Sequence, residues 1–349
     1  MKQFPTILAI DTSCDDTSVA ITQGMKVLSN IVASQTEIHR IYGGVYPLAA
    51  KLAHHELINP TYKEALKRAL INPRQIDIIA VTQGPGLAIA LEVGIEFAKL
   101  LSKELNKPLI AVNHMAGHLY SPLAVNSKGN PKPNVNHLIP SISLLVSGGH
   151  TELILIKSLN SFQKIGQTLD DAAGEALDKF ARLLDLGYPG AAAMEEIAQK
   201  GNSKTFNFPL PMTQSKDFNY SFSGLKTAGR QTIEQMKKLN ANDITNLAAS
   251  FQYAVIKAVL YKLEKAIAKY QPKSIWLGGG VSANKVLKRE LGRLCKSKSL
   301  NFLYPKIKRL NGDNAAMIGI AAYFDYQKGN LSSIPQNFDQ IQRIPRLSL

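Results

Sequence analysis

The sequence predicts an α/β protein that carries the same strand-and-turn unit twice. The first copy begins with two short runs rich in β-branched residues, 6–10 and 17–22, which flank a polar turn. The second copy begins with the apolar runs 139–146 and 151–156, again separated by a short polar turn. After each copy, strands and helices alternate, and this order is typical of α/β folds. The repetition therefore predicts a duplicated α/β unit.

The remaining elements follow from periodicity and from the residues that end each run. Apolar residues at helical spacing predict helices, short β-branched runs predict strands, and Asn-Pro and Gly-rich turns separate them. The expected helices are 48–70, 88–105, a helix that carries His114 and His118, 171–185, 191–200, 243–270, a helix that starts near 284, and 313–328. The additional expected strands are 76–82, 108–112 and 274–277, whereas 125–137 and 201–224 are expected to be irregular.

These elements group into two lobes and a tail. A chain of 349 residues is long enough for two lobes. We expect an N-terminal lobe, 1–125, a C-terminal lobe, 126–328, and a surface tail, 329–349. The last helix, 313–328, is counted with the C-terminal lobe, and the alternative is that it packs on the N-terminal lobe.

The charge and the cysteine content narrow the class of protein. The net charge is +15, with 41 Lys and Arg against 26 Asp and Glu, which favours a polyanionic partner but also suits simple solubility. The densest basic stretch is 285–309. Only Cys14 and Cys295 occur, so no disulfide framework is expected and a reducing cytoplasm fits. The N-terminus does not read as a signal peptide, and 108–127 does not read as a membrane span.

Two histidines four residues apart suggest a metal site. On a helix, His114 and His118 share one face and can bind one ion. The spacing is also compatible with an incidental pair. No Glu follows His114, so the HExxH pattern of zinc proteases is absent. Asp313, on a Gly-containing turn at a helix start, is a candidate third ligand, and its alternative role is a helix N-cap.

Three glycine-containing turns next to predicted strands and helices suggest a nucleotide site. They are 84–86, 147–149 and 278–280. Glycine allows backbone N–H groups to approach phosphate oxygens, and helix N-termini favour anions. No GxxxxGK[ST] loop occurs, so the chain is not a P-loop enzyme.

Two groups of acidic residues are candidates for proton transfer or ligand contact. The first polar turn, 11–16, offers the carboxylates of Asp11, Asp15 and Asp16. It could orient a metal-bound group or act as a general base, although Asp and Ser are also ordinary turn residues. Asp171 and Asp178 are seven residues apart and therefore share a helix face, where they could reach one site or simply form a solvated face.

Taken together, the motifs resemble those of the TsaD family, tRNA N6-adenosine threonylcarbamoyltransferases formerly described as O-sialoglycoprotein endopeptidases. The resemblance covers about 5–325. The motifs that carry it are DTSCDDT at 11–17, YGGVYP at 42–47, GPGL at 84–87, HMAGH at 114–118, LVSGGHT at 145–151, DDAAGEALDK at 170–179, SFSGLKTA at 221–228, GGGVSAN at 278–284 and GDNAAM at 312–317.

The resemblance implies a two-lobed actin/Hsp70-like ATPase (ASKHA) fold with an interlobe cleft. It also implies transfer of the threonylcarbamoyl group from threonylcarbamoyl-AMP to N6 of adenosine-37, in tRNAs that read codons beginning with A, with release of AMP. The implied metal is Fe²⁺, with Zn²⁺ as the alternative. The implied partners are tRNA, a catalytically inactive TsaB-like paralogue and a TsaE-like ATPase, with no membrane.

The same resemblance assigns site residues. His114, His118 and Asp313 correspond to the metal ligands. The positions that correspond to adenylate contacts are Leu145, Val146, Ser147, Gly148, Gly149, Asp178, Gly190, Ala191 and Asn284. Asp15 or Asp16 is the expected general base.

The chain departs from the family pattern at three positions. Ala191 replaces a glycine, so a contact made only by its backbone would persist whereas a glycine-only conformation would not, and Gly190 is then the nearest residue to the ligand. Ala116 replaces the Glu between the histidines, and Asp16 replaces a Glu in the first turn.

Two other functions remain open at the level of sequence. An ATP-dependent small-molecule kinase on the same fold would not need a His-bound metal. A non-catalytic TsaB-like partner protein would be expected to lack the metal ligands and to be shorter.

Overall fold

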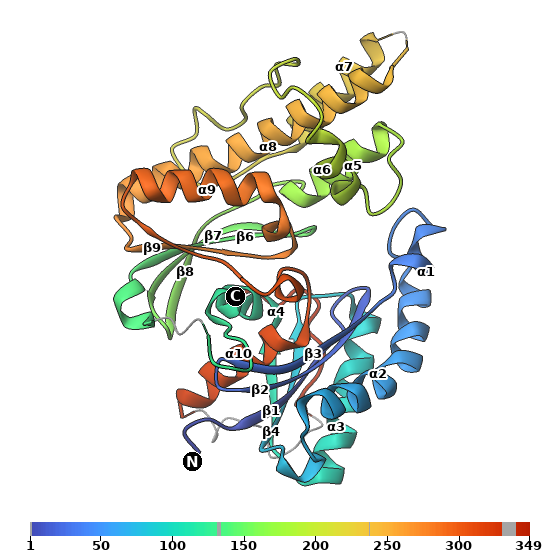
Figure 1. The fold of residues 1–349 in the computed structure, drawn as a ribbon, viewed down its shortest axis with the longest axis vertical. Helices are drawn as coiled ribbons and strands as arrows, with labels where there is room; N and C mark the ends of the chain where they lie inside the picture. The colour runs from blue at the N-terminus through green and yellow to red at the C-terminus, as the bar shows by residue number, and fades with distance from the viewer. Residues whose placement is uncertain (1, 131–133, 237, 330–339) are drawn as a thin grey trace. The chain divides into compact units, whose positions relative to one another are not determined.

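The computed structural model describes residues 2–130, 134–236, 238–329 and 340–349, and it contains two compact units. Unit 1 comprises Met1–Val135 and Tyr304–Leu349, and unit 2 comprises Asn136–Leu303. Each unit is built around one five-stranded sheet (Figure 1).

The sheet of unit 1 has the strand order β3-β2-β1-β4-β5. Its strands are β1 (Thr6–Asp11), β2 (Asp16–Gln23), β3 (Lys26–Ser34), β4 (Ile78–Gly84) and β5 (Leu109–Asn113). The first three strands pair antiparallel, with Ala9 opposite Ala20, and β4 and β5 join β1 in parallel. The parallel strands end at the same edge of the sheet, and β5 leads directly into the candidate metal helix.

Helices cover both faces of this sheet. Unit 1 contains the helices α1 (Thr36–Arg40), α2 (Pro47–Ala69), α3 (Ala88–Leu105), α4 (His114–Tyr120) and α10 (Ala315–Gln327), of which α2 and α3 cover one face of the sheet and α10 the other. On one face Leu8 and Ile10 of β1 pack with Ile58 of α2 and Val93 of α3 in the main apolar core. On the other face α10 packs against β1 and β2 so closely that a Cβ at Gly319 would lie 3.3 Å from the Cβ of Ala9. A sheet covered on both faces explains why β1 is buried along its whole length.

Unit 2 repeats this topology. Its strands are β6 (Ser141–Val146), β7 (Thr151–Ser158), β8 (Ser161–Gln167), β9 (Ser274–Gly278) and β10 (Asn301–Leu303), in the order β10-β9-β6-β7-β8. Strands β6, β7 and β8 pair antiparallel, and β9 and β10 add in parallel on the other side of β6. Read from the third strand of each unit, the two sheets have the same order and the same directions, so the predicted duplication of an α/β unit is confirmed.

The helices of unit 2 are α5 (Ala173–Leu183), α6 (Gly190–Ala198), α7 (Ser223–Gln235), α8 (Ala241–Tyr270) and α9 (Lys285–Ser297). Phe180 of α5 stacks on Phe251 of α8, with ring centroids 3.8 Å apart, and this pair joins the helices at the centre of the unit. Figure 1 shows α8 and α9 running beside each other over the sheet. No helix among the described residues is long and apolar enough to cross a membrane.

Several elements differ from those expected from sequence. The third strand of each sheet, β3 and β8, and the short β10 were not predicted, and α7 begins where an irregular segment was expected to end. Within the tail, residues 330–339 lie outside the described residues. The following segment, 340–349, runs along unit 1, where Ile341 is buried and the amide of Ile344 donates to the carbonyl of Gln83.

Candidate active site

The candidate metal centre begins with the short helix α4, which follows β5 without a loop. Asn113, the last residue of β5, is also the N-cap of α4, and its side-chain oxygen accepts hydrogen bonds from the amides of Met115 and Ala116 at 2.8 and 3.2 Å. This cap compensates two of the free N–H groups at the helix start. It fixes the helix so that His114 and His118, one turn apart, present their rings on the same side, with centroids 4.7 Å apart.

The third candidate ligand comes from the other end of the chain. Asp313 lies two residues before α10, and the N-cap of α10 is Asn314, whose side chain accepts from the amide of Met317 at 3.2 Å. The alternative role of Asp313 as an N-cap is therefore wrong. Because α10 packs against α4, where a Cβ on Gly117 would lie only 2.9 Å from Cγ of Met317, Asp313 is held beside the two histidines.

The three side chains meet at one point. Asp313 Oδ1 lies 3.5 Å from His114 Nε2 and 3.1 Å from His118 Nε2, and the candidate ligand atoms of the three residues all lie within 4.8 Å of one another. Ligands that bind one ion at about 2.0–2.2 Å are separated from each other by roughly 3.0–3.5 Å in tetrahedral or octahedral geometry. The two distances to Asp313 fall in this range, so the residues present fit a divalent ion.

The hydrogen bonding of the histidines supports the same fit. His114 is 7% exposed and His118 1% exposed, and Nε2 of His118 lies 3.1 Å from Asp313 Oδ1 without a hydrogen bond to it or to any other described residue. Buried polar atoms without a partner are rare and need a reason. Two imidazoles and one carboxylate also form the donor set of many Fe²⁺ sites and suit Zn²⁺ as well.

Electrostatics at this point favour a cation. Burial alone would lower the pKa of His114, but the negative charges of Asp313 and Asp11 outweigh it and raise that pKa to about 10. Burial would raise the pKa of Asp313, yet His114 and His118 hold it well below its ordinary value. Asp11 Oδ1 is 3.7 Å from His114 Nδ1, too far for a hydrogen bond but close enough to contribute negative potential.

The first polar turn places Asp15 and Asp16 in the same unit as the metal ligands. Burial raises the pKa of Asp16 to about 7, and Asp16 Oδ1 is buried without a hydrogen-bond partner among the described residues. Burial and the neighbouring Asp15 also raise the pKa of the Cys14 thiol, which therefore stays protonated and is a poor metal ligand. A pKa of about 7 lies in the range that proton transfer at neutral pH requires, so Asp16 fits the expected role of general base.

In unit 2 the turn at 147–149 lies between β6 and β7. The amide of Ser147 donates to the carbonyl of His150 at 2.8 Å, so this N–H is already used. Gly148 and Gly149 are exposed, and their amides have no hydrogen-bond acceptor among the described residues. Leu145 and Val146, by contrast, are buried strand residues. Only the two glycine amides of this turn are therefore available to an anion.

Two other segments converge on this turn. A Cβ on Gly174, in the first turn of α5, would clash with the carbonyl oxygen of Ser147, and a Cβ on Gly279 would clash with that of Val146. Gly279 also has φ +88°, which side chains rarely adopt. The glycine turn after β9, the 147–149 turn and the N-terminus of α5 therefore approach one another at backbone distance, as expected for a phosphate-binding arrangement.

Asp178, Gly190 and Ala191 form a second group. Asp178 Oδ1 accepts from the amide of Ala191 at 2.7 Å at the start of α6. Burial raises the pKa of Asp178, although its hydrogen bonds to Ala191 and Gly190 oppose the increase. A Cβ on Gly190 would lie 2.6 Å from Cβ of Ala181, so packing requires glycine there. Ala191 lies in α6 with ordinary helical geometry, so its replacement of glycine leaves the backbone conformation accessible.

Asn284 caps the helix α9. Its Oδ1 accepts from the amide of Leu287 at 2.9 Å and its Nδ2 donates to Gln252 Oε1 at 2.8 Å. Asn284 is 6% exposed and Gln252 4% exposed, so this amide pair is buried. Gln252 was not identified from sequence, because its contact with Asn284 spans two elements far apart in the chain.

The glycine turn at 84–86 behaves differently from the other two. The amide of Gly86 donates to the carbonyl of Pro345, and a Cβ on Gly84 would clash with the carbonyl of Ile344. A Cβ on Gly86 would lie 2.5 Å from the carbonyl oxygen of Ser13. These glycines are needed for close backbone packing, and the expectation that this turn binds phosphate is wrong for the amide of Gly86.

Solved structures agree with the fold. The HypF protein of T. kodakarensis aligns with a TM-score of 0.61 and 15% identity, over 94% of this chain and 48% of that chain. The activator of the 2-hydroxyisocaproyl-CoA dehydratase from Clostridium difficile, solved with bound ADPNP, aligns with a TM-score of 0.51 and 13% identity, over 95% of this chain and 99% of its own. At this identity the likeness shows the fold alone, which is the predicted ASKHA type.

Sequence comparisons identify the family. The family model of TsaD, tRNA N6-adenosine threonylcarbamoyltransferase, matches residues 26–320. The protein of that name from Thermosipho melanesiensis is 48% identical over 91% of this chain and 94% of its own length. The one from Thermosipho africanus is 43% identical over 98% of this chain and 99% of its own length. The chain therefore belongs to the TsaD family of tRNA N6-adenosine threonylcarbamoyltransferases.

Proposed function

We propose that the protein transfers the threonylcarbamoyl group from threonylcarbamoyl-AMP to N6 of adenosine-37 in tRNAs that read codons beginning with A. Membership of the family supports the reaction type and the tRNA acceptor. The single observation that carries the proposal is the convergence of His114, His118 and Asp313, because a kinase on this fold needs no such ligand set and an inactive paralogue would be free to lose it.

In this proposal the chain holds the donor through unit 2. The amides of Gly148 and Gly149 and the N-terminus of α5 would bind the phosphate of the adenylate, since they combine free N–H donors with the positive end of a helix. Asp178 and Asn284 would contribute by fixing the starts of α6 and α9, where their side chains already accept backbone amides. Their free oxygen lone pairs remain available to the adenosine part of the donor.

The metal, Fe²⁺ or alternatively Zn²⁺, would be held by His114, His118 and Asp313 and would supply Lewis-acid chemistry for the threonylcarbamoyl oxygens. The N6 amine attacks the carbamoyl carbon, the bond from that carbon to the phosphate oxygen breaks, and AMP leaves with the electron pair. Asp16, whose pKa of about 7 leaves a substantial carboxylate fraction at neutral pH, would accept the proton that N6 loses. Asp15 is the alternative acceptor.

Partner proteins and location belong to the same proposal. The family resemblance suggests a TsaB-like paralogue and a TsaE-like ATPase as partners, and a tRNA acceptor is consistent with work in the cytoplasm. The surplus of basic residues, including the stretch 285–309, suits a polyanionic acceptor.

Reconstitution tests the proposal directly. Unmodified tRNA is incubated with the protein, the two partner proteins and threonylcarbamoyl-AMP, and the digested nucleosides are measured by mass spectrometry. We expect threonylcarbamoyladenosine only when tRNA, donor and wild-type chain are all present, and strong loss of product with His118→Ala. Full activity of that variant would refute the metal assignment, and an unmodified tRNA with the complete wild-type mixture would refute the reaction.

A further inference from the structure

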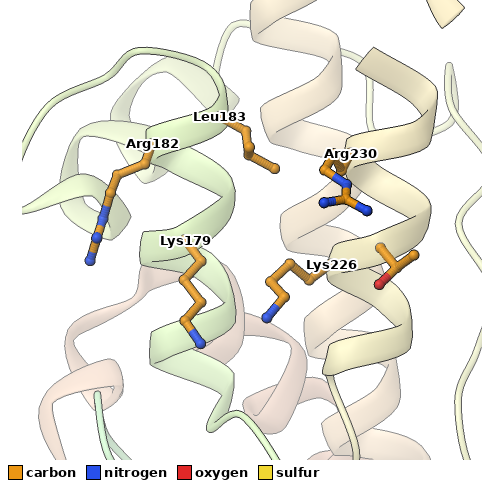
Figure 2. Close-up of a pocket in the computed structure, with 6 residues that line it drawn as sticks. Lys179, Arg182, Leu183, Lys226 and Arg230 are labelled. Atoms are coloured by element: carbon orange, nitrogen blue, oxygen red, sulfur yellow. The ribbon is translucent and has the colours of Figure 1, made fainter. Parts of the chain in front are cut away.

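A basic cavity lies in unit 2, between α5 and α7. It has a volume of about 320 Å³ and is lined by Lys179, Arg182, Leu183, Lys226, Thr227 and Arg230. Four of these six residues are basic and none is acidic. Figure 2 shows Lys179 and Lys226 extending toward one another across the gap between the two helices, with Arg230 further along α7. A concentration of positive charge in a cavity favours an anionic ligand.

The two lysines are held in place by one carboxylate. Asp171 accepts from Lys179 Nζ through Oδ1 and from Lys226 Nζ through Oδ2, each at 2.7 Å. Lys179 also pairs with Glu175 at 2.7 Å. A shared carboxylate allows two like charges to lie near each other, and an ammonium has three N–H groups. Lys226 therefore keeps donors for a further anion.

The helix α7 is positioned by Asp170, the acidic residue next to Asp171. Asp170 accepts from the amide of Phe222 at 2.7 Å and from the hydroxyls of Ser221 and Ser223 at 2.5 and 2.6 Å, all at or just before the start of α7. The spacing of α5 and α7 thus depends on side chains just before α5 as well as on helix packing. Because the two helices are already held at this spacing, less conformational entropy is lost when a ligand binds between them.

The arginines are the least compensated charges of the cavity. Arg182 forms no ion pair with any described residue, and Figure 2 shows its side chain directed away from α7. Arg230 is 60% exposed and only 3.6 Å from Glu234, an exposed and therefore weak pair. The Arg230 guanidinium can accordingly bind a phosphate without first losing a strong partner.

The cavity is offset along α5 from the turns that we assign to the donor phosphate, although burial raises the pKa of the nearby donor residue Asp178 and the charge of Arg182 opposes this increase. Those turns meet the first turn of α5, near Gly174, whereas the cavity is lined by Lys179 to Leu183 at the other end of that helix. At about 1.5 Å per residue, Gly174 and Leu183 are roughly 13 Å apart along the helix. Exposed fractions of 33% for Lys179 and 31% for Lys226 place these cations where a polymer on the surface can reach them.

We propose that this cavity binds backbone phosphates of the RNA acceptor. The inference rests on the proposed function for the identity of the anion. Leu183, which is 39% exposed at the cavity, adds an apolar contact suited to a ribose or base next to the phosphate. The cavity positions the RNA and takes no part in the chemical step.

The test measures tRNA affinity against salt for the full-length chain. Each lost phosphate contact should reduce the slope of log K against log salt by about 0.7–0.9, which is roughly a fourfold loss of affinity at 0.15 M salt. We expect losses of that size for Lys226→Gln and Arg230→Gln. Lys226→Arg should retain most of the slope, because it keeps the charge. Lys257→Gln, at an exposed position of α8, is the matched control and should bind as the wild type does.

The outcomes separate this inference from the proposed function. If Lys226→Gln and Arg230→Gln bind tRNA with wild-type affinity and slope while the wild type modifies tRNA, the cavity assignment is wrong and the function stands. If both variants weaken tRNA binding although the wild type modifies no tRNA, the cavity assignment stands and the reaction fails. Weakened binding of AMP or inorganic phosphate without any change for tRNA would assign the cavity to a small anion and overturn the inference. In the modification assay the variants should raise KM for tRNA and leave kcat unchanged.

Discussion

Removal of the carboxylate of Asp313 should abolish the stabilisation of the protein by a divalent metal. Asp313 Oδ1 lies 3.5 and 3.1 Å from the ring nitrogens of His114 and His118, and it is the only anion of the three candidate ligands. Asp313→Asn keeps the size of the side chain but removes the negative charge that attracts a cation to the two histidines. The two histidines alone would bind the ion much more weakly.

The magnitude follows from mass action. An ion present at 100 times its dissociation constant stabilises the folded state by about 2.7 kcal/mol. For a unit of 150–250 residues, which includes the size of unit 1, each kcal/mol shifts Tm by roughly 2–4 °C. Saturating metal should therefore raise Tm of the wild-type transition by roughly 5–10 °C, and Asp313→Asn should lose most of this increase.

The assay is thermal unfolding of chelator-treated protein with and without Zn²⁺, or with Fe²⁺ under anaerobic conditions. For each variant the result is the difference between Tm with metal and Tm without metal. Any effect of the substitution on the stability of the ion-free protein cancels in this difference. Asp325→Asn is the matched control, because Asp325 lies on α10, outside the group of candidate ligands, and pairs with Lys328 in a part-buried i,i+3 ion pair. If Asp313→Asn retained the full metal-dependent increase, or if Asp325→Asn lost it, the ligand assignment would be wrong.

Three further predictions follow from other contacts. Burial raises the pKa of Asp16 to about 7, so the folded chain binds this proton more tightly than the unfolded chain, and stability is lost as pH rises from 4 to 7. Asp16→Asn should therefore gain about 2.5 kcal/mol over the wild type between pH 5 and pH 8 in urea unfolding without metal, and an equal difference at both pH values would contradict the assigned pKa. Asn113→Ala should remove the N-cap of α4 and lower the free energy of unfolding by about 1 kcal/mol. It should also weaken metal affinity measured by calorimetry, and unchanged affinity would show that the cap does not position His114. Phe251→Ala should destabilise unit 2 by about 3–5 kcal/mol in denaturant unfolding, because it removes a ring stacked on Phe180 in a buried core, and a loss below 1 kcal/mol would mean that the core refills the space.

Much of the fold could be predicted because its strands are short, buried and β-branched. The hairpins at the start of each unit and the helices α3, α8 and α10 follow from such runs and from helical periodicity. The third strands escaped prediction for a physical reason. Most residues of β3 and β8 are only partly buried or exposed, so polar residues interrupt the apolar alternation. Strand β10 has three residues, and α7 contains glycines and few apolar positions.

The candidate site was predictable in its residue types and less so in its contacts. The spacing of His114 and His118 indicates a shared helix face, but it does not show which carboxylate joins them. Asp313 is nearly 200 residues later, and only the packing of α10 on α4 brings it near. Gln252 lies beside Asn284 through the tertiary fold alone, and no local pattern reports this neighbour.

Unit 1 is assembled from both ends of the chain, whereas unit 2 is one continuous segment. On the ribosome, where folding proceeds from the N-terminus, the sheet with His114 and His118 emerges first, but α10, Asp313 and the 340–349 segment emerge last. Until α10 packs, the sheet face that it covers and the helix that carries the two histidines therefore remain uncovered. A metal site made by all three ligands therefore requires that α10 has already packed on α4.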